Sequence, residues 1–353
     1  MAVRKVGTCR IVRELGRGGM GVVFEAVQEG LDRRVAVKAL DGKLSGTAEV
    51  VERFKREGRA YAQLRHQAVV TVHDLVEKDD SLYLITEFVD GPDLARVLRQ
   101  GGAVPPDCVA VVGARMAEAL DYIHFHKLLH RDVKPANIMV SNDGDVKLVD
   151  FGIAKDQTAD DLTREGVVVG SPAYMPPEVM NGEEADAKAD IWALGVTLYE
   201  LAAARRPFRA PTTESLVQAV RAGAFPRLRS LAPGVPRRLA RAIERCLRRR
   251  PRDRWPDAGA LAAELELCAV QALQGLNPRA RLVGLLTHRG FMGQEQALTR
   301  IDSKSLQASR VIDEATVVIE EAPRPRRWGW ALLVLLAVGA GAAAIWARYR
   351  GLL

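Results

Sequence analysis

The chain has 353 residues, which is enough for a two-part enzyme and one additional segment. Hydrophobic residues make up 48% of it and charged residues 27%, a composition that is typical of globular proteins and excludes a disordered chain. The net charge is +7, but only 5% of the residues are aromatic, whereas a nucleic-acid-binding surface interleaves basic with aromatic side chains. We therefore expect no nucleic acid partner.

The four cysteines are far apart in the sequence and form no CxxC pair, so neither a zinc site nor a disulfide framework is predicted. They are Cys9, Cys108, Cys246 and Cys268. Reduced thiols in a cytosolic domain are expected instead. The first ten residues have no apolar stretch behind their charges, so we expect no secretory signal.

Residues 9–89 have the pattern of strands with one helix. β-branched runs broken by glycine or charged turns predict strands at 11–12, 22–27, 35–40, 69–76 and 82–89. Helical periodicity predicts a helix at 51–64 and, further on, helices at 106–126 and 190–204 with shorter ones up to 268. A β-rich part followed by a helical part predicts an α+β fold of two lobes with a cleft between them.

The periodicity weakens after residue 268, so residues 269–327 are predicted to be a linker with at most short helices. Residues 328–347 are then twenty residues without a charge, which at about 1.5 Å each span the ~30 Å hydrocarbon core. Tryptophans lie near both ends, where interfacial indole rings are expected. The prediction is a single transmembrane helix followed by a short tail at 348–353; a buried helix of a soluble protein is the alternative.

Gly16, Gly18, Gly21 and Val23 form a GxGxxGxV pattern. A dinucleotide-binding turn has the same glycine spacing, but it opens a helix, whereas residues 22–27 are strand-like. A glycine loop between two strands predicts a flap whose backbone amides lie over phosphates. A plain hairpin turn is the alternative.

Ala36 and Lys38 lie on one face of the predicted strand at 35–40. A small residue beside a nucleotide base and an ammonium group beside its phosphates would therefore point the same way. A buried ammonium group needs a counter-charge, and we expect Glu57 on the predicted helix to supply it. Gly58 beside it costs about 1 kcal/mol of helix propensity, so this helix is expected to swing or fray.

The sequence HRDVKPAN at 130–137 and the sequence DFG at 150–152 lie on either side of a predicted hairpin. The dipeptide Asp143-Gly144 is favoured in two-residue hairpin turns, and with these residues at the centre Asn137 would lie directly opposite Asp150. An amide oxygen and a carboxylate are hard ligands that suit Mg²⁺ bound to nucleotide phosphates.

Two further side chains of the 130–137 sequence fit a phosphoryl transfer. Asp132 can face a substrate hydroxyl, and Lys134 can meet the charge that develops on the transferred group. A chance hairpin with acidic ends is the alternative.

These motifs, in this order, resemble the eukaryotic-type Ser/Thr protein kinases in the compact form common in bacteria. The resemblance covers residues 9–268 and implies an N-lobe at 9–89, a C-lobe at 90–268, and transfer of the ATP γ-phosphoryl group to protein hydroxyls with Mg²⁺, or Mn²⁺ as an alternative metal. It implies that Asp132 orients and deprotonates the acceptor hydroxyl, assisted by Lys134, and that Lys38 pairs with the ATP phosphates and Glu57.

The resemblance also assigns the binding residues. Asn137 and Asp150 would bind the metal. The residues implied to contact ATP are Gly16, Arg17, Gly18, Gly19, Met20, Gly21, Val23, Ala36, Lys38, Thr86, Glu87, Val89 and Met139. Further along the chain, Glu178 would pair with Arg254, and Asp190 would hold the 130–137 loop from beneath.

Control by phosphorylation is expected around Arg131, whose guanidinium group is a natural phosphate clamp. The loop at 153–170 carries two hydroxyl side chains, and we expect autophosphorylation at Thr163 first and then at Thr158. Ser171 offers a further hydroxyl near Asp132 and, like Lys134, favours Ser/Thr over Tyr specificity. Ordinary solvated threonines are the alternative.

The expected partners are ATP, protein substrates and a membrane, with the kinase domain on its cytoplasmic side. Two further partners are alternatives, a homodimer and a phosphothreonine-reading protein that would bind phosphorylated Thr299 or Thr316. A plain linker without such a partner is the other interpretation of this segment. A scaffold without activity (a pseudokinase) is the alternative function, and Lys38, Asp132 and Asp150 argue against it. An aminoglycoside-type phosphotransferase would lack the lower-lobe sequence that ends at Glu178.

Overall fold

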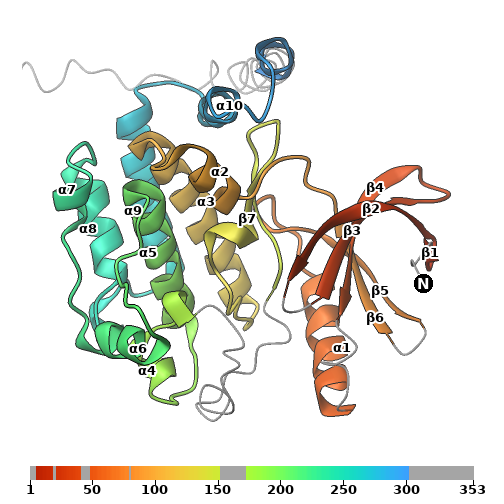
Figure 1. Ribbon diagram of the computed structural model, residues 1–353, viewed down its shortest axis with the longest axis horizontal. Helices are drawn as coiled ribbons and strands as arrows, with labels where there is room; N and C mark the ends of the chain where they lie inside the picture. Colours follow the sequence, from red (N-terminus) through yellow and green to blue (C-terminus); the bar gives the residue numbers. More distant parts are fainter. Residues whose placement is uncertain (1–4, 19–20, 41–47, 79–80, 152–171, 302–353) are drawn as a thin grey trace, which may run out of the picture. The chain divides into compact units, whose positions relative to one another are not determined.

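A computed structural model of the chain describes residues 5–18, 21–40, 48–78, 81–151 and 172–301 (Figure 1). No helix within these ranges is long and apolar enough to cross a bilayer. The predicted transmembrane segment at 328–347 and its tail lie outside the described residues. So do five of the predicted site residues, namely Gly19, Met20, Thr158, Thr163 and Ser171.

In the described residues, the N-lobe is a six-stranded antiparallel sheet with one helix, α1 (Ala48–Ala62), which packs against β5. The strands, in the sheet order β1-β2-β3-β4-β6-β5, are β1 (Lys5–Val6), β2 (Cys9–Gly18), β3 (Gly21–Gln28), β4 (Arg33–Leu40), β6 (Ser81–Glu87) and β5 (Val72–Lys78). Strand alternation buries Val35 and Val37 of β4 in one apolar cluster, so Ala36 and Lys38 lie on the opposite face.

The described part of the C-lobe is mainly helical and holds one short hairpin, β7 paired with β8 (Figure 1). Its elements are α2 (Leu94–Gly101), α3 (Pro106–Phe125), β7 (Ile138–Val140), β8 (Val146–Leu148), α4 (Pro177–Met180), α5 (Ala187–Ala203), α6 (Thr213–Ala222), α7 (Leu228–Leu231), α8 (Arg237–Cys246), α9 (Ala258–Leu273) and α10 (Pro278–His288). The middle of the C-lobe is α5, which is buried along most of its length because its sequence is apolar on every side.

A close approach of α5 to α8 requires a residue without a side chain. A Cβ atom added at Gly195 would overlap with the Cβ of Cys246 and lie 3.2 Å from Leu247 Cδ2. The two helices therefore pack with their backbones close together, and this contact fixes the position of α5.

The predicted α+β arrangement, a strand-rich lobe followed by a helical lobe, is confirmed. The helix predicted at 51–64 is observed as Ala48–Ala62, and the one predicted at 106–126 as Pro106–Phe125. The helix predicted at 190–204 is observed as Ala187–Ala203, which begins earlier because Asp186 caps it by accepting a hydrogen bond from the backbone of Lys188.

The folded unit continues beyond the predicted domain boundary at 268, which falls inside α9. Helix α10 follows, residues 294–301 are helical as well, and the compact unit extends to Ile301. Leu282, Leu285 and Leu286 explain the difference, because they recur at helical spacing and are buried in the main core. Residues 269–301 of the predicted linker are thus part of the folded domain.

Candidate active site

Lys38 is placed by the register of the N-lobe sheet, in which it lies opposite Val23 on β3 and Leu84 on β6. Its Nζ is 3.0 Å from Asp150 Oδ1, and the lysine side chain is only 17% exposed. A mostly enclosed ammonium group is stabilised by a nearby carboxylate, and here the carboxylate comes from the C-lobe. Strand β4 thus carries the charged group that links the two lobes.

Glu57 on α1 pairs with Arg131, whose Nη1 is 3.2 Å from Glu57 Oε1. The sequence predicted a Lys38–Glu57 pair, but in this structure each of the two residues has a different partner. Glu57 lies within reach of a guanidinium group that the linear sequence could not place beside it, while Lys38 meets Asp150.

Asp132 is the centre of a small hydrogen-bond network in the 130–137 loop. Its Oδ2 accepts hydrogen bonds from Lys134 Nζ at 2.9 Å and from Asn137 Nδ2 at 2.8 Å. Asn137 Nδ2 also donates to the backbone oxygen of Asp132 at 2.8 Å. Since these bonds occupy the amide nitrogen, Asn137 presents its amide oxygen as an acceptor on the other side.

The hairpin that carries Asn137 and Asp150 has a register different from the predicted one. Ile138 pairs with Leu148 and Val140 with Val146, so Asn137 lies opposite Val149, whose N–H donates to Asn137 O at 2.9 Å. The prediction of Asn137 directly opposite Asp150 was wrong by one residue.

The turn explains this shift, because it spans residues 141–145 instead of two residues. Ser141 Oγ accepts hydrogen bonds from the backbone N–H of Asp143 and of Asp145, at 3.3 and 3.0 Å. Asp150, after β8, no longer has the extended backbone of a strand, because its φ is 58°. Its backbone oxygen is 3.5 Å from Asn137 Nδ2, so the two residues still lie next to each other.

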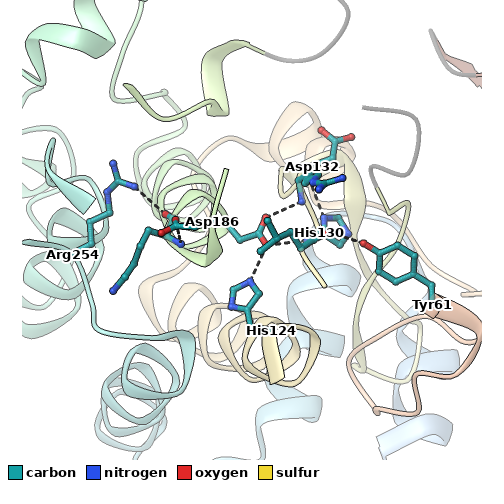
Figure 2. A network of polar contacts seen from close by, with 10 residues as sticks. Tyr61, His124, His130, Asp132, Asp186 and Arg254 are labelled. Carbon is teal, nitrogen blue, oxygen red and sulfur yellow. Dashed lines mark hydrogen bonds and ion pairs between the residues drawn. The ribbon is translucent and has the colours of Figure 1, made fainter. Parts of the chain in front are cut away.

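Asp190, at the start of α5, holds the 130–137 loop from beneath, as the resemblance implied. Its carboxylate is 2% exposed and accepts hydrogen bonds from the backbone N–H of His130 at 2.9 Å and of Arg131 at 2.8 Å. His124 Nε2 lies 2.9 Å from the same carboxylate. Figure 2 shows this network beneath the loop, with the carboxylate of Asp132 pointing away from it.

Burial would by itself raise the pKa of Asp190, but the hydrogen bonds from His124 and the loop backbone outweigh it and lower the pKa. The carboxylate therefore stays charged. Arg131 has φ of 62°, a left-handed conformation that is costly for arginine, and the bond from its N–H to Asp190 helps to keep it there.

Tyr61 on α1 contacts the same loop and was not predicted. Its hydroxyl donates to Leu129 O at 2.6 Å (Figure 2). Its ring stacks on Phe151 with 3.9 Å between centroids. Burial raises the pKa of Tyr61, so the hydroxyl remains a donor. Neither Tyr61 nor His124 belongs to a motif; a polar ring at a buried position of an otherwise apolar helix face is the only sequence signal they give.

Thr86, Glu87 and Val89, three of the residues predicted to contact ATP, belong to the segment that joins the two lobes, which we call the hinge, and the acidic side chain of this hinge is paired. Glu87 pairs with Lys147 of β8 at 2.9 Å, and its backbone N–H donates to Thr71 O at 2.8 Å. Thr86 Oγ1 donates to Glu87 O at 3.3 Å, and Val89 is 8% exposed. The side chains of the hinge are therefore engaged in contacts within the protein.

The described part of the glycine loop is a hairpin, since Gly18 pairs with Gly21 between β2 and β3. This geometry fits the predicted flap and excludes the turn that opens a helix. The surroundings of Gly16 are open, with no atom of the described residues within 4 Å of an added Cβ. The Arg17 side chain is 68% exposed and pairs with Glu14. Val23, Ala36 and Met139 are partly buried.

The predicted pair between Glu178 and Arg254 is present, with two parallel hydrogen bonds. It joins α4 to the loop that precedes α9.

Comparison with known proteins assigns the family. Residues 9–264 match the protein kinase domain, so the chain belongs to the protein kinase family. It is similar to two serine/threonine-protein kinases of Mycobacterium tuberculosis, PknH with 38% identity over 257 residues and PknL with 35% over 256 residues. Each match covers 72% of this chain, but only 41% of PknH and 64% of PknL.

Among solved structures, the kinase domain of Mycobacterium tuberculosis PknI aligns with a TM-score of 0.61 and 30% identity, over 75% of this chain and 98% of that domain. The resemblance to bacterial Ser/Thr protein kinases that the motifs indicated is therefore confirmed.

Proposed function

We propose that the chain transfers the γ-phosphoryl group of ATP to Ser and Thr hydroxyls of proteins. The observation that carries this proposal is the network of Asp132, Lys134 and Asn137 on a loop fixed by Asp190. Membership of the kinase family and the similarity to named Ser/Thr kinases support it. Nothing in the residues of the site supports the alternative of an inactive scaffold.

In the proposed reaction the acceptor hydroxyl oxygen attacks the γ-phosphorus and the bond to the β-phosphate oxygen breaks, so that ADP leaves. Asp132 orients the hydroxyl and takes its proton. Lys134, already 2.9 Å from Asp132 Oδ2, balances negative charge on the transferred group. Both side chains are mostly buried, at 10% and 21% exposure, which strengthens these electrostatic effects.

Asn137 and Asp150 fit a divalent cation through the chemistry of their donors, an amide oxygen and a carboxylate. Among the described residues no group of three or more His, Cys, Asp or Glu could hold a metal ion. Two protein ligands suit Mg²⁺, or Mn²⁺, because such ions keep waters and bind substrate phosphates. The metal would neutralise charge on the phosphates.

Nucleotide binding requires two of the observed ion pairs to change. Lys38 would leave Asp150 for the phosphates, and Glu57 would leave Arg131 for Lys38. The proposed contacts with the base are Val23, Ala36 and Met139, with the backbone of Thr86, Glu87 and Val89 along its edge. The loop of Gly16, Arg17, Gly18, Gly19, Met20 and Gly21 would cover the phosphates through its amides.

The test is transfer of labelled phosphate from ATP to casein by residues 1–301, with Mg²⁺ or Mn²⁺. Asp132→Asn should lower kcat by about 10²- to 10⁴-fold and leave the Kd for ATP within about twofold. Asp121→Asn, an exposed carboxylate on α3, is the matched control and should keep full turnover. Label on phosphotyrosine alone, or wild-type turnover by Asp132→Asn, would contradict the proposal.

Self-activation is a second part of the proposal. A phosphate on Thr163 or Thr158 would compete with Glu57 for the Arg131 guanidinium group and so release Glu57 for Lys38. Mass spectrometry of the active wild type should find these phosphates, and of Lys38→Met should not. Unmodified loop threonines in a fully active enzyme would rule this regulation out.

Membrane attachment through residues 328–347 is proposed from their length, lack of charge and terminal tryptophans. The full chain should stay with the membrane fraction in alkaline carbonate, whereas residues 1–327 should not. A homodimer and a phosphothreonine-reading partner remain predictions. Thr299, one of the two candidate threonines, is exposed and donates its hydroxyl to Glu295 O at 3.0 Å.

A further inference from the structure

The segment after the family match packs on the C-lobe through α10. Asn277 caps this helix by accepting hydrogen bonds from the N–H of Arg279 and Ala280, at 2.9 and 3.3 Å, and Pro278 occupies its first turn. The apolar face of α10 is buried in the main core. The segment is therefore a fixed element of the domain, although the match to the kinase family ends at residue 264.

Two arginines of this segment, Arg279 and Arg300, form ion pairs with the turn between β7 and β8. Arg279 Nη2 is 2.7 Å from Asp145 Oδ1, and Arg300 Nη1 is 2.8 Å from Asp143 Oδ1. The two aspartates flank Gly144, so the tip of the hairpin is held from both sides. Opposite charges at these distances attract, and the four side chains are only partly exposed, at 29% to 51%.

The contact at the tip also involves the backbone. Gly144 has φ of 81°, and an added Cβ would overlap with the carbonyl oxygen of Arg279 and lie 2.8 Å from its Cα. No side chain fits between the turn and the first residues of α10. The hairpin tip and α10 therefore cannot shift independently.

Other contacts fix α10 to the C-lobe. Arg281 pairs with Asp107 at the start of α3, and Arg289 Nη2 donates to Ala103 O at 2.6 Å. The guanidinium group of Arg96 on α2 lies over the ring of Phe291, 5.7 Å from its centroid. Because α10 is attached to α2 and α3, it can act as a fixed support for the hairpin.

The hairpin is short, with three residue pairs between its turn and its base. Asn137 precedes β7 and Asp150 follows β8, so a displacement of the tip is carried about 10 Å to these residues. We propose that Arg279 and Arg300 are positioning residues that hold the β7–β8 hairpin and thereby the metal-binding oxygens of Asn137 and Asp150. The assignment of Asn137 and Asp150 as metal ligands rests on the proposed function.

The test uses the full chain with Arg279→Gln and Arg300→Gln combined. The matched control combines Arg237→Gln and Arg241→Gln, which remove the same charge from exposed positions of α8. The first readout is hydrogen exchange of the amides at 138–149 without nucleotide, and the second is the Mg²⁺ concentration for half-maximal phosphoryl transfer. The hairpin amides should exchange faster and the Mg²⁺ requirement should rise two- to fivefold, while KM for the protein substrate stays unchanged.

A variant in which the charges of one ion pair are swapped separates a positioning role of the arginines from an effect on overall stability. Arg279→Asp alone should raise the Mg²⁺ requirement, and adding Asp145→Arg should bring it back toward the wild-type value. If the double glutamine variant does not fold, the single Arg300→Gln variant is measured in the same two ways.

The proposal is overturned if hairpin exchange and Mg²⁺ requirement match the wild type, or if the α8 control changes them equally. A wild type that transfers no phosphate contradicts the proposed function. Hydrogen exchange needs no turnover, so it still decides whether the two arginines hold the hairpin.

Discussion

Arg254 and Glu178 form a buried ion pair with two parallel hydrogen bonds, Nη1 to Oε1 at 2.6 Å and Nη2 to Oε2 at 2.7 Å. The arginine side chain has no exposed surface, and the glutamate side chain is 8% exposed. The remaining guanidinium hydrogens are bound by backbone oxygens, among them Arg248 O at 2.9 Å and Lys188 O at 3.0 Å. Every donor of the buried cation is thereby used.

Removal of one member of this pair should be costly. We expect Arg254→Met to lower the free energy of unfolding by about 3–5 kcal/mol, because it leaves the Glu178 carboxylate buried without a counter-charge. Urea unfolding measures this change. The double variant Arg254→Met with Glu178→Gln should recover part of the loss. A single variant within about 1 kcal/mol of the wild type would show that the carboxylate finds water instead.

Loss of the Arg131 side chain should tighten nucleotide binding in the unphosphorylated chain. Its pair with Glu57 must break if Glu57 is to meet Lys38, and a partly exposed pair contributes about 0.2–1 kcal/mol. Arg131→Gln should therefore lower the Kd for Mg·ATP by about 1.5- to 5-fold, measured with a fluorescent nucleotide.

Arg99→Gln, which removes one exposed charge from α2, is the control for net charge and should weaken binding slightly or leave it unchanged. An Arg131→Gln variant that binds Mg·ATP no better than Arg99→Gln would mean that the Glu57–Arg131 pair does not oppose binding.

Stability should fall in mild acid because of His130. Complete burial lowers the pKa of this imidazole, so the folded chain binds fewer protons there than the unfolded chain. That contribution to stability is fully present above the unfolded pKa of about 6.5 and is lost as the pH falls below it, by at most about 1.4 kcal/mol per pH unit. Unfolding in urea between pH 7.5 and pH 5.5 measures the slope.

The pKa of His66 and of His73 is also lowered, mainly by burial, so the wild type alone cannot isolate one residue. His130→Phe keeps a ring beside Phe151 and should flatten the pH dependence. Equal slopes for wild type and variant would exclude His130 as the source.

The cysteines should not react with a disulfide reagent in the folded chain. All four are buried, and burial raises the pKa of Cys108 and of Cys246 to about 12 and that of Cys268 to about 11. Since the thiolate is the reactive form, dithiobisnitrobenzoate should label them only after unfolding in urea. Rapid labelling of one cysteine in native buffer would reveal local opening around it.

Features that depend on local pattern could be predicted from the sequence. Strand alternation alone places Ala36 and Lys38 on one face of β4, and apolar periodicity gives α1 and α3 within a few residues. The motifs led to the correct prediction that Asp190 lies beneath the 130–137 loop and that Glu178 lies beside Arg254. The face of β4 and the two helices follow from local pattern, whereas the places of Asp190, Glu178 and Arg254 followed only from the resemblance to the kinase family.

Features decided by competition in three dimensions could not be predicted. In the folded chain Lys38 lies beside Asp150 and Glu57 beside Arg131, and the sequence alone does not say which opposite charges come within reach of each other. An Asp-Gly dipeptide fits both a two-residue turn and the longer turn found at Asp143 and Gly144. Here the Ser141 hydroxyl favours the longer turn, because it accepts hydrogen bonds from two backbone N–H groups of the turn. The role of Arg279 and Arg300 depends on aspartates more than 100 residues earlier in the sequence.

Two of the side chains proposed for function are carried on left-handed backbone, Arg131 with φ of 62° and Asp150 with φ of 58°. Glycine would relieve about 1–2 kcal/mol of strain at either place. A library of random variants sorted only for survival at high temperature would therefore enrich replacements that remove the guanidinium group or the carboxylate. Directed evolution of this chain toward heat resistance must therefore include a turnover screen, because selection for stability alone would favour loss of the proposed metal ligand Asp150 and of the proposed regulatory residue Arg131.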